Sequence, residues 1–374
     1  MSFALARHGY RSANDTTPQL TLLLGPTVEP NSVEMPFYDG TFSGDLLPDV
    51  LSRTLPDVTN EVKKIIKQET HKEKIYIKGY TDASLSRTFE TAVAWVDYLR
   101  GIDVCGVVTE PNNAVDPRVS NDAAELNLDN ENFIASQQAA ALLFKEKAHK
   151  QWKKLLVALG FKEVSAPANE YDEIPTNSKD RALYFLQLPA KSYDFGTAVI
   201  MAFGLERKTA KEVLRQANWP KPKQSKNQKK WFKAAADLMG TIMAVWYPSG
   251  SVANTMSAPL AYLAVNWFKE KEKEEEKDTS KLLVAVSHEE PNNYFRATLG
   301  LGLFYYALPT SCMLFIKHEN ILKVYVVHNE VTKSGKISKK AKSKKIGDIP
   351  FEKLQKLASI QISPLPDFVC ATFQ

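Results

Sequence analysis

The sequence predicts an α/β protein with a central mixed sheet, helices on both faces of that sheet, and an inserted, mostly helical cap domain. Apolar strand-like runs lie near both ends of the chain, and a long helical stretch separates them. With 374 residues, 44% of them hydrophobic and 24% charged, the composition is that of a globular protein with a large core. We therefore expect a discontinuous α/β core over 1–110 and 270–374 and a largely helical cap over 111–269.

The N-terminal elements begin with a short buried strand. The run SFALA at 2–6 is almost wholly apolar, which is typical of a strand covered on both faces. Residues 12–60 are rich in Pro, Asp, Ser and Thr, so we expect mostly loop there. A helical pattern covers 61–68, and the alternation in KIYIKGYT at 74–81 predicts a second strand.

The middle of the chain is predicted to be mainly helical. An amphipathic run over 85–101 predicts a helix that Gly101 ends, and VCGVVTE at 104–110 is typical of a strand. From about 113 to 270 the pattern is mostly helical. A mixed-charge loop is expected over 269–281.

The C-terminal elements return to strands. LLVAVS at 282–287 predicts a buried strand, and a helix is expected over 292–303. The run 310–331 predicts a β-hairpin that turns at 318–320, and a closing helix is expected over 350–360.

The cysteines and the hydropathy of the sequence indicate the cellular compartment in which the protein is expected. The three cysteines, Cys105, Cys312 and Cys370, are odd in number and far apart, which is typical of a reducing compartment. The first residues lack the basic start and apolar run of a signal peptide, so we expect a cytoplasmic protein. Two uncharged stretches, 238–268 and 297–316, are interrupted by polar residues, Gly or Pro, and we interpret both as core, with no membrane span.

Polar side chains suited to one chemistry follow the predicted strands. His8 comes directly after the first strand and His288 after the strand at 282–287, and a helix after the strand at 74–81 bears Arg87. Chemistry in such sheets gathers where strands end. The set comprises two imidazoles, three guanidinium groups and a carboxylate: His8, His288, Arg7, Arg11, Arg87 and Glu289.

These groups together suit phosphoryl transfer. Arginine binds phosphate oxygens through two parallel hydrogen bonds and keeps its charge. An imidazole can attack phosphorus when its other nitrogen is held, and a carboxylic acid can protonate the leaving oxygen. The other four histidines show no metal-ligand spacing, so we expect no metal and no other cofactor.

The same residues resemble the histidine acid phosphatases, a branch of the histidine phosphatase superfamily. RHGYRS at 7–12 is similar to the family motif R-H-G-x-R-x-P, with Ser12-Ala13 in place of x-Pro. Arg87 lies in a Ser- and Thr-rich turn before a helix, like the second family landmark, and His288-Glu289 stands where the family has H-D. The run after Glu289 also resembles the family's C-terminal half, and the chain looks like a divergent, intracellular member.

The resemblance implies a phosphomonoesterase that acts on a phosphorylated small molecule. It implies that His8 is the nucleophile and forms a phosphohistidine, and that Glu289 donates the proton to the leaving group. It also implies four phosphate-binding groups: Arg7, Arg11, Arg87 and His288.

Two basic runs, 221–233 and 333–345, hold much of the net charge of +5. Such runs suit either a polyanion or a solvated loop, and the solvated loop is the simpler interpretation. If the first run overhangs the pocket, it favours a polyanionic substrate such as an inositol phosphate. The candidate substrate entrance then consists of five lysines: Lys221, Lys223, Lys226, Lys229 and Lys230.

Two other functions remain open at this point. The chain could be a catalytically inactive relative that serves as a binding or scaffold protein, although the intact set of arginines and histidines argues against this. It could also bind nucleic acid through the runs 221–233 and 333–345, but these lack regular aromatic interleaving. The sequence thus favours the phosphatase over a nucleic-acid partner and leaves the oligomeric state open.

Overall fold

The structure, a computed structural model, describes an eight-stranded sheet and helices around it. The described residues are 1–10, 46, 48–81, 86–99, 103–106, 151, 154, 200, 228–246, 251–270, 279–302, 306–334, 336–360 and 369–371. Arg11 and most of the predicted cap over 111–269 therefore lie outside them.

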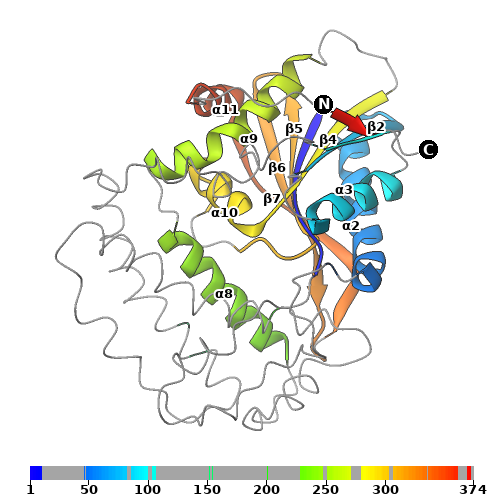
Figure 1. Cartoon of the computed structure of the whole chain (residues 1–374), viewed down its shortest axis with the longest axis vertical. Coiled ribbons are helices and arrows are strands. Elements are labelled where there is room, and N and C mark those ends of the chain that lie inside the picture. The colour runs from blue at the N-terminus through cyan, green and yellow to red at the C-terminus, as the bar shows by residue number, and fades with distance from the viewer. Residues whose placement is uncertain are drawn as a thin grey trace, which may run out of the picture.

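The described strands form one mixed sheet of eight, in the order β7-β6-β5-β1-β4-β2-β3-β8 (Figure 1). The strands are β1 (Ser2–Arg7), β2 (Lys74–Thr81), β3 (Asp103–Gly106), β4 (Thr279–Ser287), β5 (Cys312–His318), β6 (Ile321–Val331), β7 (Ile337–Pro350) and β8 (Val369–Ala371). β1, β4, β2 and β3 are parallel neighbours, whereas β5, β6 and β7 form an antiparallel meander beside β1. The predicted mixed sheet is confirmed.

Helices cover both faces of the sheet, as predicted. α2 (Pro48–Thr70) and α3 (Ser86–Leu99) lie on one face, and α9 (Ser251–Glu270), α10 (Glu289–Thr298) and α11 (Phe351–Ala358) lie on the other (Figure 1). β1 shows why both faces must be covered, because its side chains alternate between two cores. Ala4 and Ala6 pack toward α2 and α3, whereas Phe3 and Leu5 pack toward the opposite helices.

The register of the parallel strands sets the position of the site. Arg7 of β1 pairs with Ser287 of β4, and Thr81 of β2 pairs with Val286. The three strands therefore end level, and the residues that follow β1 and β4 emerge at the same edge of the sheet. His8 and His288 are those residues.

Several predicted elements agree with the structure. The strand at 74–81 has the predicted bounds, and β1 extends the predicted 2–6 by one residue. The hairpin formed by β5 and β6 turns through Glu319, whose φ of 50° lies in the left-handed region. The closing helix α11 also falls inside its predicted range.

Three local predictions differ from the structure. The region 12–60, expected to be mostly loop, is helical from Pro48 onward, where α2 begins with proline at its first position, and residues 12–45 and 47 lie outside the described ones. The helix expected over 292–303 runs instead from Glu289 to Thr298, and it ends before Gly300, whose φ is 73°. The interpretation of 333–345 as a solvated loop is wrong because β7 begins at Ile337 and pairs with β6.

The predicted cap is described only in its last part. α8 (Lys229–Trp246) packs against α10, and α9 packs on the sheet, where Trp267 Nε1 donates a hydrogen bond of 2.8 Å to the Ser2 carbonyl. The division into core and cap thus stays a prediction. Within the described ranges, no helix is both long and apolar enough to cross a membrane.

Candidate active site

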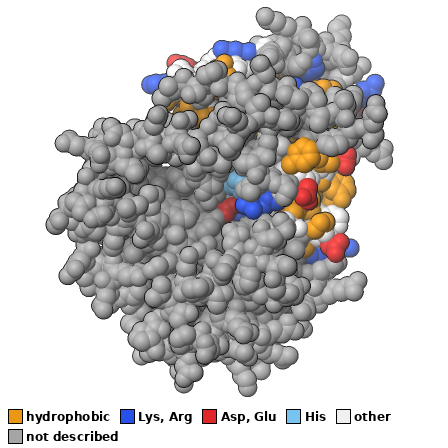
Figure 2. Space-filling model, viewed as in Figure 1, with side chains coloured by type: hydrophobic (Ala, Val, Ile, Leu, Met, Phe, Trp, Pro, Cys, Tyr) orange, Lys and Arg blue, Asp and Glu red, His pale blue; other side chains and the backbone are white. Residues whose placement is uncertain are grey.

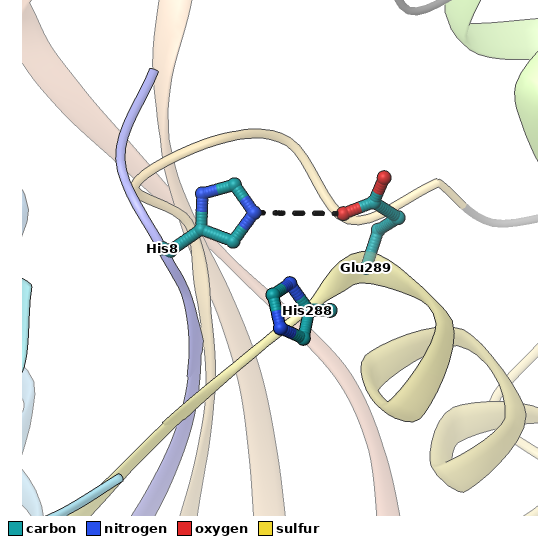
Figure 3. A group of neighbouring side chains, drawn as sticks. All are labelled: His8, His288 and Glu289. Carbon is teal, nitrogen blue, oxygen red and sulfur yellow. Dashed lines mark ion pairs between the residues drawn. The ribbon is translucent and has the colours of Figure 1, made fainter. Parts of the chain in front are cut away.

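The chain segments that leave β1 and β4 bring two buried histidines together. The ring centroids of His8 and His288 lie 5.1 Å apart with an interplanar angle of 71°, and Glu289 projects beside them (Figure 3). The His8 backbone N–H donates to the Ser287 carbonyl at 3.0 Å, so the sheet hydrogen bonding continues to the histidine itself. On its other side, the His8 carbonyl accepts a hydrogen bond from the Thr310 N–H at 3.2 Å.

One hydrogen bond fixes the tautomer of His8. Its Nδ1 lies 2.7 Å from the Gly9 carbonyl oxygen. Because a carbonyl oxygen can only accept, Nδ1 is the protonated nitrogen and, in the neutral ring, Nε2 carries the lone pair. Nε2 points toward Glu289 and lies 3.9 Å from its Oε2 (Figure 3). The arrangement therefore presents a nucleophilic nitrogen next to a carboxyl group.

Gly9 allows the backbone to turn closely against α2. A Cβ atom at this position would lie 2.9 Å from Leu46 Cδ1 and 2.9 Å from Leu51 Cδ1, which is too close for any other residue without movement. The Gly9 N–H donates to Thr91 Oγ1 at 3.1 Å, and that hydroxyl donates to the Arg87 carbonyl at 2.7 Å. The first turn of α3, which bears the half-buried Arg87, is thereby joined to the turn after His8.

Arg7 is fully buried and held from three sides. Its Nη1 donates to the Ala307 carbonyl at 2.6 Å, and its Nη2 lies 2.9 Å from Glu289 Oε2. Its guanidinium also stacks over the Tyr306 ring, with Cζ 4.9 Å from the ring centroid. These contacts fix a permanent cation beside the two histidines.

The N-terminus of α10 positions the other half of the site. His288 is the N-cap residue, with an extended backbone and no capping hydrogen bond from its side chain. Its carbonyl accepts a hydrogen bond from Asn292 Nδ2 at 2.8 Å. Glu289 is the first helical residue, where the helix dipole favours a negative charge. The imidazole of His288 thus does not cap α10 and lies against the His8 ring instead.

Sequence reasoning missed three neighbours of Arg7. Tyr306 stacks on it, and Asn293 Oδ1 accepts the Ala307 N–H at 3.0 Å, which positions the carbonyl that holds Arg7. Tyr10 is buried as well, and burial raises the pKa of its hydroxyl although the nearby Arg7 and Arg53 oppose the shift. Asn293 lies one helical turn after Glu289, which is the signal that could have pointed to it.

The nitrogen and oxygen donors of His8, His288 and Glu289 lie within 4.8 Å of one another, a spacing that could hold a metal ion. However, the Arg7 guanidinium already lies 2.9 Å from Glu289, and a bound cation would meet this fixed positive charge. Two imidazoles and a buried guanidinium suit an anion better. Figure 2 shows histidine, acidic and basic side chains gathered near the middle of one face of the molecule.

The structure therefore brings four predicted site residues together: Arg7, His8, His288 and Glu289. Arg87 lies on the helix joined to Gly9. Lys229 and Lys230 are exposed at the start of α8, whereas Arg11, Lys221, Lys223 and Lys226 lie outside the described residues.

Comparisons with known proteins show a shared fold. No family model and no curated protein matches the sequence. Among solved structures, the phytase of Klebsiella sp. ASR1 has a TM-score of 0.55 at 13% identity, with 96% of this chain and 95% of that chain covered. The phytase of Hafnia alvei has a TM-score of 0.62 in complex with myo-inositol hexakis sulphate, at 12% identity and 97% and 96% coverage. Its apo form has a TM-score of 0.60, at 12% identity and 97% and 98% coverage.

Proposed function

We propose that the protein hydrolyses phosphate monoesters through a phosphohistidine formed on His8. The observation that carries the proposal is the tautomer of His8, whose Nδ1 donates to the Gly9 carbonyl at 2.7 Å and so leaves the lone pair on Nε2. This lone pair lies among a fixed guanidinium, a second imidazole and a carboxyl group. The fold shared with two phytases supports the same reaction class.

In the proposed first step, His8 Nε2 attacks phosphorus while the bond from phosphorus to the ester oxygen breaks. Arg7, Arg11, Arg87 and His288 hold the phosphate oxygens and stabilise their charge. Glu289 gives its proton to the departing alkoxide, which leaves as an alcohol. In the second step, Glu289 accepts a proton from water, and the water oxygen displaces His8 from phosphorus to release inorganic phosphate.

The contact between Arg7 and Glu289 influences whether the carboxyl group of Glu289 is ionised or protonated. In the structure the two form a buried ion pair at 2.9 Å, which favours the ionised carboxylate. An incoming phosphate competes for the same guanidinium and places its own negative charge beside Glu289. Both effects favour the protonated carboxyl group, which is the form that the first step requires.

We further propose that the substrate is polyanionic, in the class of inositol phosphates. One phytase of similar fold was solved in complex with myo-inositol hexakis sulphate, a sixfold anionic ligand. Lys229 and Lys230 belong to the basic run 221–233. Both side chains are exposed at the start of α8. In this proposal the whole run, with Lys221, Lys223 and Lys226, lines the substrate entrance.

Turnover of p-nitrophenyl phosphate by purified protein in EDTA tests the proposed activity. We expect release of nitrophenol by the natural sequence and loss of at least a thousandfold in His8→Ala, because the nucleophile is absent. The matched control is His71→Asn, since His71 is exposed at the far end of α2 and its φ of 56° suits asparagine. Normal turnover by His8→Ala would refute the assignment. Phosphate binding without turnover would instead indicate an inactive binding protein.

A further inference from the structure

The structure joins two basic runs that are about a hundred residues apart in the sequence. The Gln228 N–H, at the start of α8, donates to the Lys333 carbonyl at 3.0 Å. Glu330 of β6 then pairs with both runs, since its Oε1 lies 3.8 Å from Lys229 Nζ and 2.9 Å from Lys342 Nζ. The first turn of α8 and the hairpin of β6 and β7 thus form one continuous surface.

This surface is strongly basic because of β7. The segment 333–345 contains seven lysines and no acidic residue. Ser343 donates to Glu61 of α2 at 2.7 Å, whereas Lys342 contacts Glu330 on the α8 side, so alternate side chains of β7 point to opposite faces. Lys344 shares the face of Lys342, about 6.6 Å from it along the strand. Lys340 lies two residues before Lys342, where the pairing of β7 with β6 becomes irregular.

Most of this charge is not neutralised by neighbours. Lys340, Lys342 and Lys344 are exposed, as are Lys229 and Lys230 at the start of α8. Glu330 neutralises part of the charge of Lys229 and Lys342. Within the described ranges, Lys340 and Lys344 form no ion pair. We call these five lysines the basic surface.

The basic surface lies at the same end of the sheet as the candidate active site. Ile337, the first residue of β7, packs against the small apolar cluster of Tyr10 and Val50, and Tyr10 is two residues after His8. The register agrees, because Cys312 at the start of β5 pairs with Val327, and Val327 pairs with Ser343. β7 is also one of the two edge strands of the described sheet, so its exposed lysines lie at the rim of the sheet.

We propose that the basic surface binds the anionic face of a phospholipid bilayer. A bilayer carries diffuse negative charge, which attracts clustered lysines near its surface. Single-stranded nucleic acid is bound instead with the help of aromatic side chains on which bases stack. The aromatic residues of the run 221–233, Trp231 and Phe232, are only 1% and 7% exposed and so cannot provide such stacking.

Lysine on an edge strand also prevents pairing between sheets of different molecules. Protection of the edge strand requires only the lysines of β7 and does not require lysines from α8 on the same face. It therefore explains only part of the basic surface. Membrane binding through the basic surface would hold the candidate active site close to the lipid headgroups. Lys229 and Lys230 belong both to the proposed substrate entrance and to the basic surface, whereas membrane binding through the lysines of β7 does not depend on the proposed catalysis.

Sedimentation with vesicles tests the proposal. We expect the full chain to bind vesicles of phosphatidylcholine and phosphatidylserine at low salt, to be released by high salt, and not to bind phosphatidylcholine alone. The double variant Lys340→Gln/Lys344→Gln leaves the pair between Lys342 and Glu330 intact. Its affinity should fall roughly 25-fold, because each lysine near an anionic bilayer contributes a factor of about five.

The control is Lys74→Gln/Lys356→Gln, which makes the same change in net charge with exposed lysines of β2 and α11. It should bind as the unchanged protein does, and thermal melting should show both variants folded. Equal losses in the two variants, or no loss in the first, would overturn the proposal. Binding to single-stranded RNA without any binding to the anionic vesicles would overturn it in favour of a nucleic-acid surface.

Discussion

At the scale of single residues, the site is organised around two fixed groups. His8 is held by the carbonyl of its own neighbour, Gly9, and Arg7 by Ala307, Glu289 and Tyr306. Neither group has to reorganise when an anion arrives, and such preorganisation is the main source of electrostatic catalysis. Glu289 is the residue whose environment changes most on binding, because its partner Arg7 is also the partner proposed for the phosphate.

The role of Glu289 can be tested through the leaving group. An alkoxide needs a proton to depart, whereas nitrophenolate does not, so Glu289→Gln should slow the hydrolysis of alkyl phosphates by roughly a hundredfold or more. The loss for p-nitrophenyl phosphate should be much smaller. Rapid kinetics with the two substrate types measure the difference.

Two variants serve as controls for this prediction. Glu289→Asp keeps a carboxyl group with a shorter reach and should retain much of the activity. Glu290→Gln should change little, because consecutive residues do not aim at one point. If the defect that depends on the leaving group appears in Glu290→Gln and not in Glu289→Gln, the proton donor has been assigned to the wrong residue.

At the scale of elements, local pattern predicted the strands with clear alternation or continuous apolar character. β2 has its predicted bounds because KIYIKGYT alternates, and β1 is apolar over nearly its whole length. β7 was missed since lysine has little preference for strands, and its conformation comes from pairing with β6. α2 was predicted too short because its first residues belong to a region rich in Pro, Asp, Ser and Thr, although the burial of Val50, Leu51 and Leu55 keeps the helix continuous.

The residues of the candidate site also fall into two groups: those that a local sequence pattern indicates and those that only the folded chain brings to the site. Arg7, His8, His288 and Glu289 lie at the ends of strands or within two residues of them, so short motifs in the sequence indicate them. Tyr306 and Asn293 act through contacts with Arg7 and Ala307 that only the folded chain creates. No local pattern could have predicted those contacts.

A second cluster joins α2 to the hairpin at the opposite end of the sheet. Glu69 accepts hydrogen bonds from Lys323, at 2.6 Å, and from the Tyr325 hydroxyl, and it lies 3.1 Å from His318 Nε2. Burial alone would raise the pKa of Glu69, but the hydrogen bonds from Lys323 and Tyr325 outweigh it and lower the pKa below the ordinary 4.5. The ionised carboxylate is therefore favoured in the folded state.

This shift predicts how stability depends on pH. Because the folded pKa is the lower one, the contribution of Glu69 is complete above the ordinary value of 4.5 and is lost as the pH falls below it. Glu69→Gln should lower the free energy of unfolding by about 1 kcal/mol at neutral pH and by less in acid. Urea unfolding at a series of pH values measures this, with Glu352→Gln on the exposed face of α11 as the control. Parallel pH profiles for Glu69→Gln and the unchanged protein would contradict the prediction.

At the scale of the whole molecule, the order of the strands makes the site. β1 lies between β4 and β5, although these neighbours come from the other end of the chain. Groups about 280 residues apart in the sequence thereby meet at one edge of the sheet, beside a basic surface that also joins distant segments. The phytases of similar fold share 12–13% identity with this chain, so the likeness concerns architecture, and the chemistry depends on the site.

The most direct test of the central claim is to trap the phosphohistidine. The protein is mixed with a phosphate monoester labelled at phosphorus and quenched in alkali, because phosphohistidine is labile in acid. We expect label on the peptide that contains His8, and no label in His8→Ala. Label on another residue, or turnover without any alkali-stable label on the natural sequence, would contradict the assignment of His8 as the nucleophile.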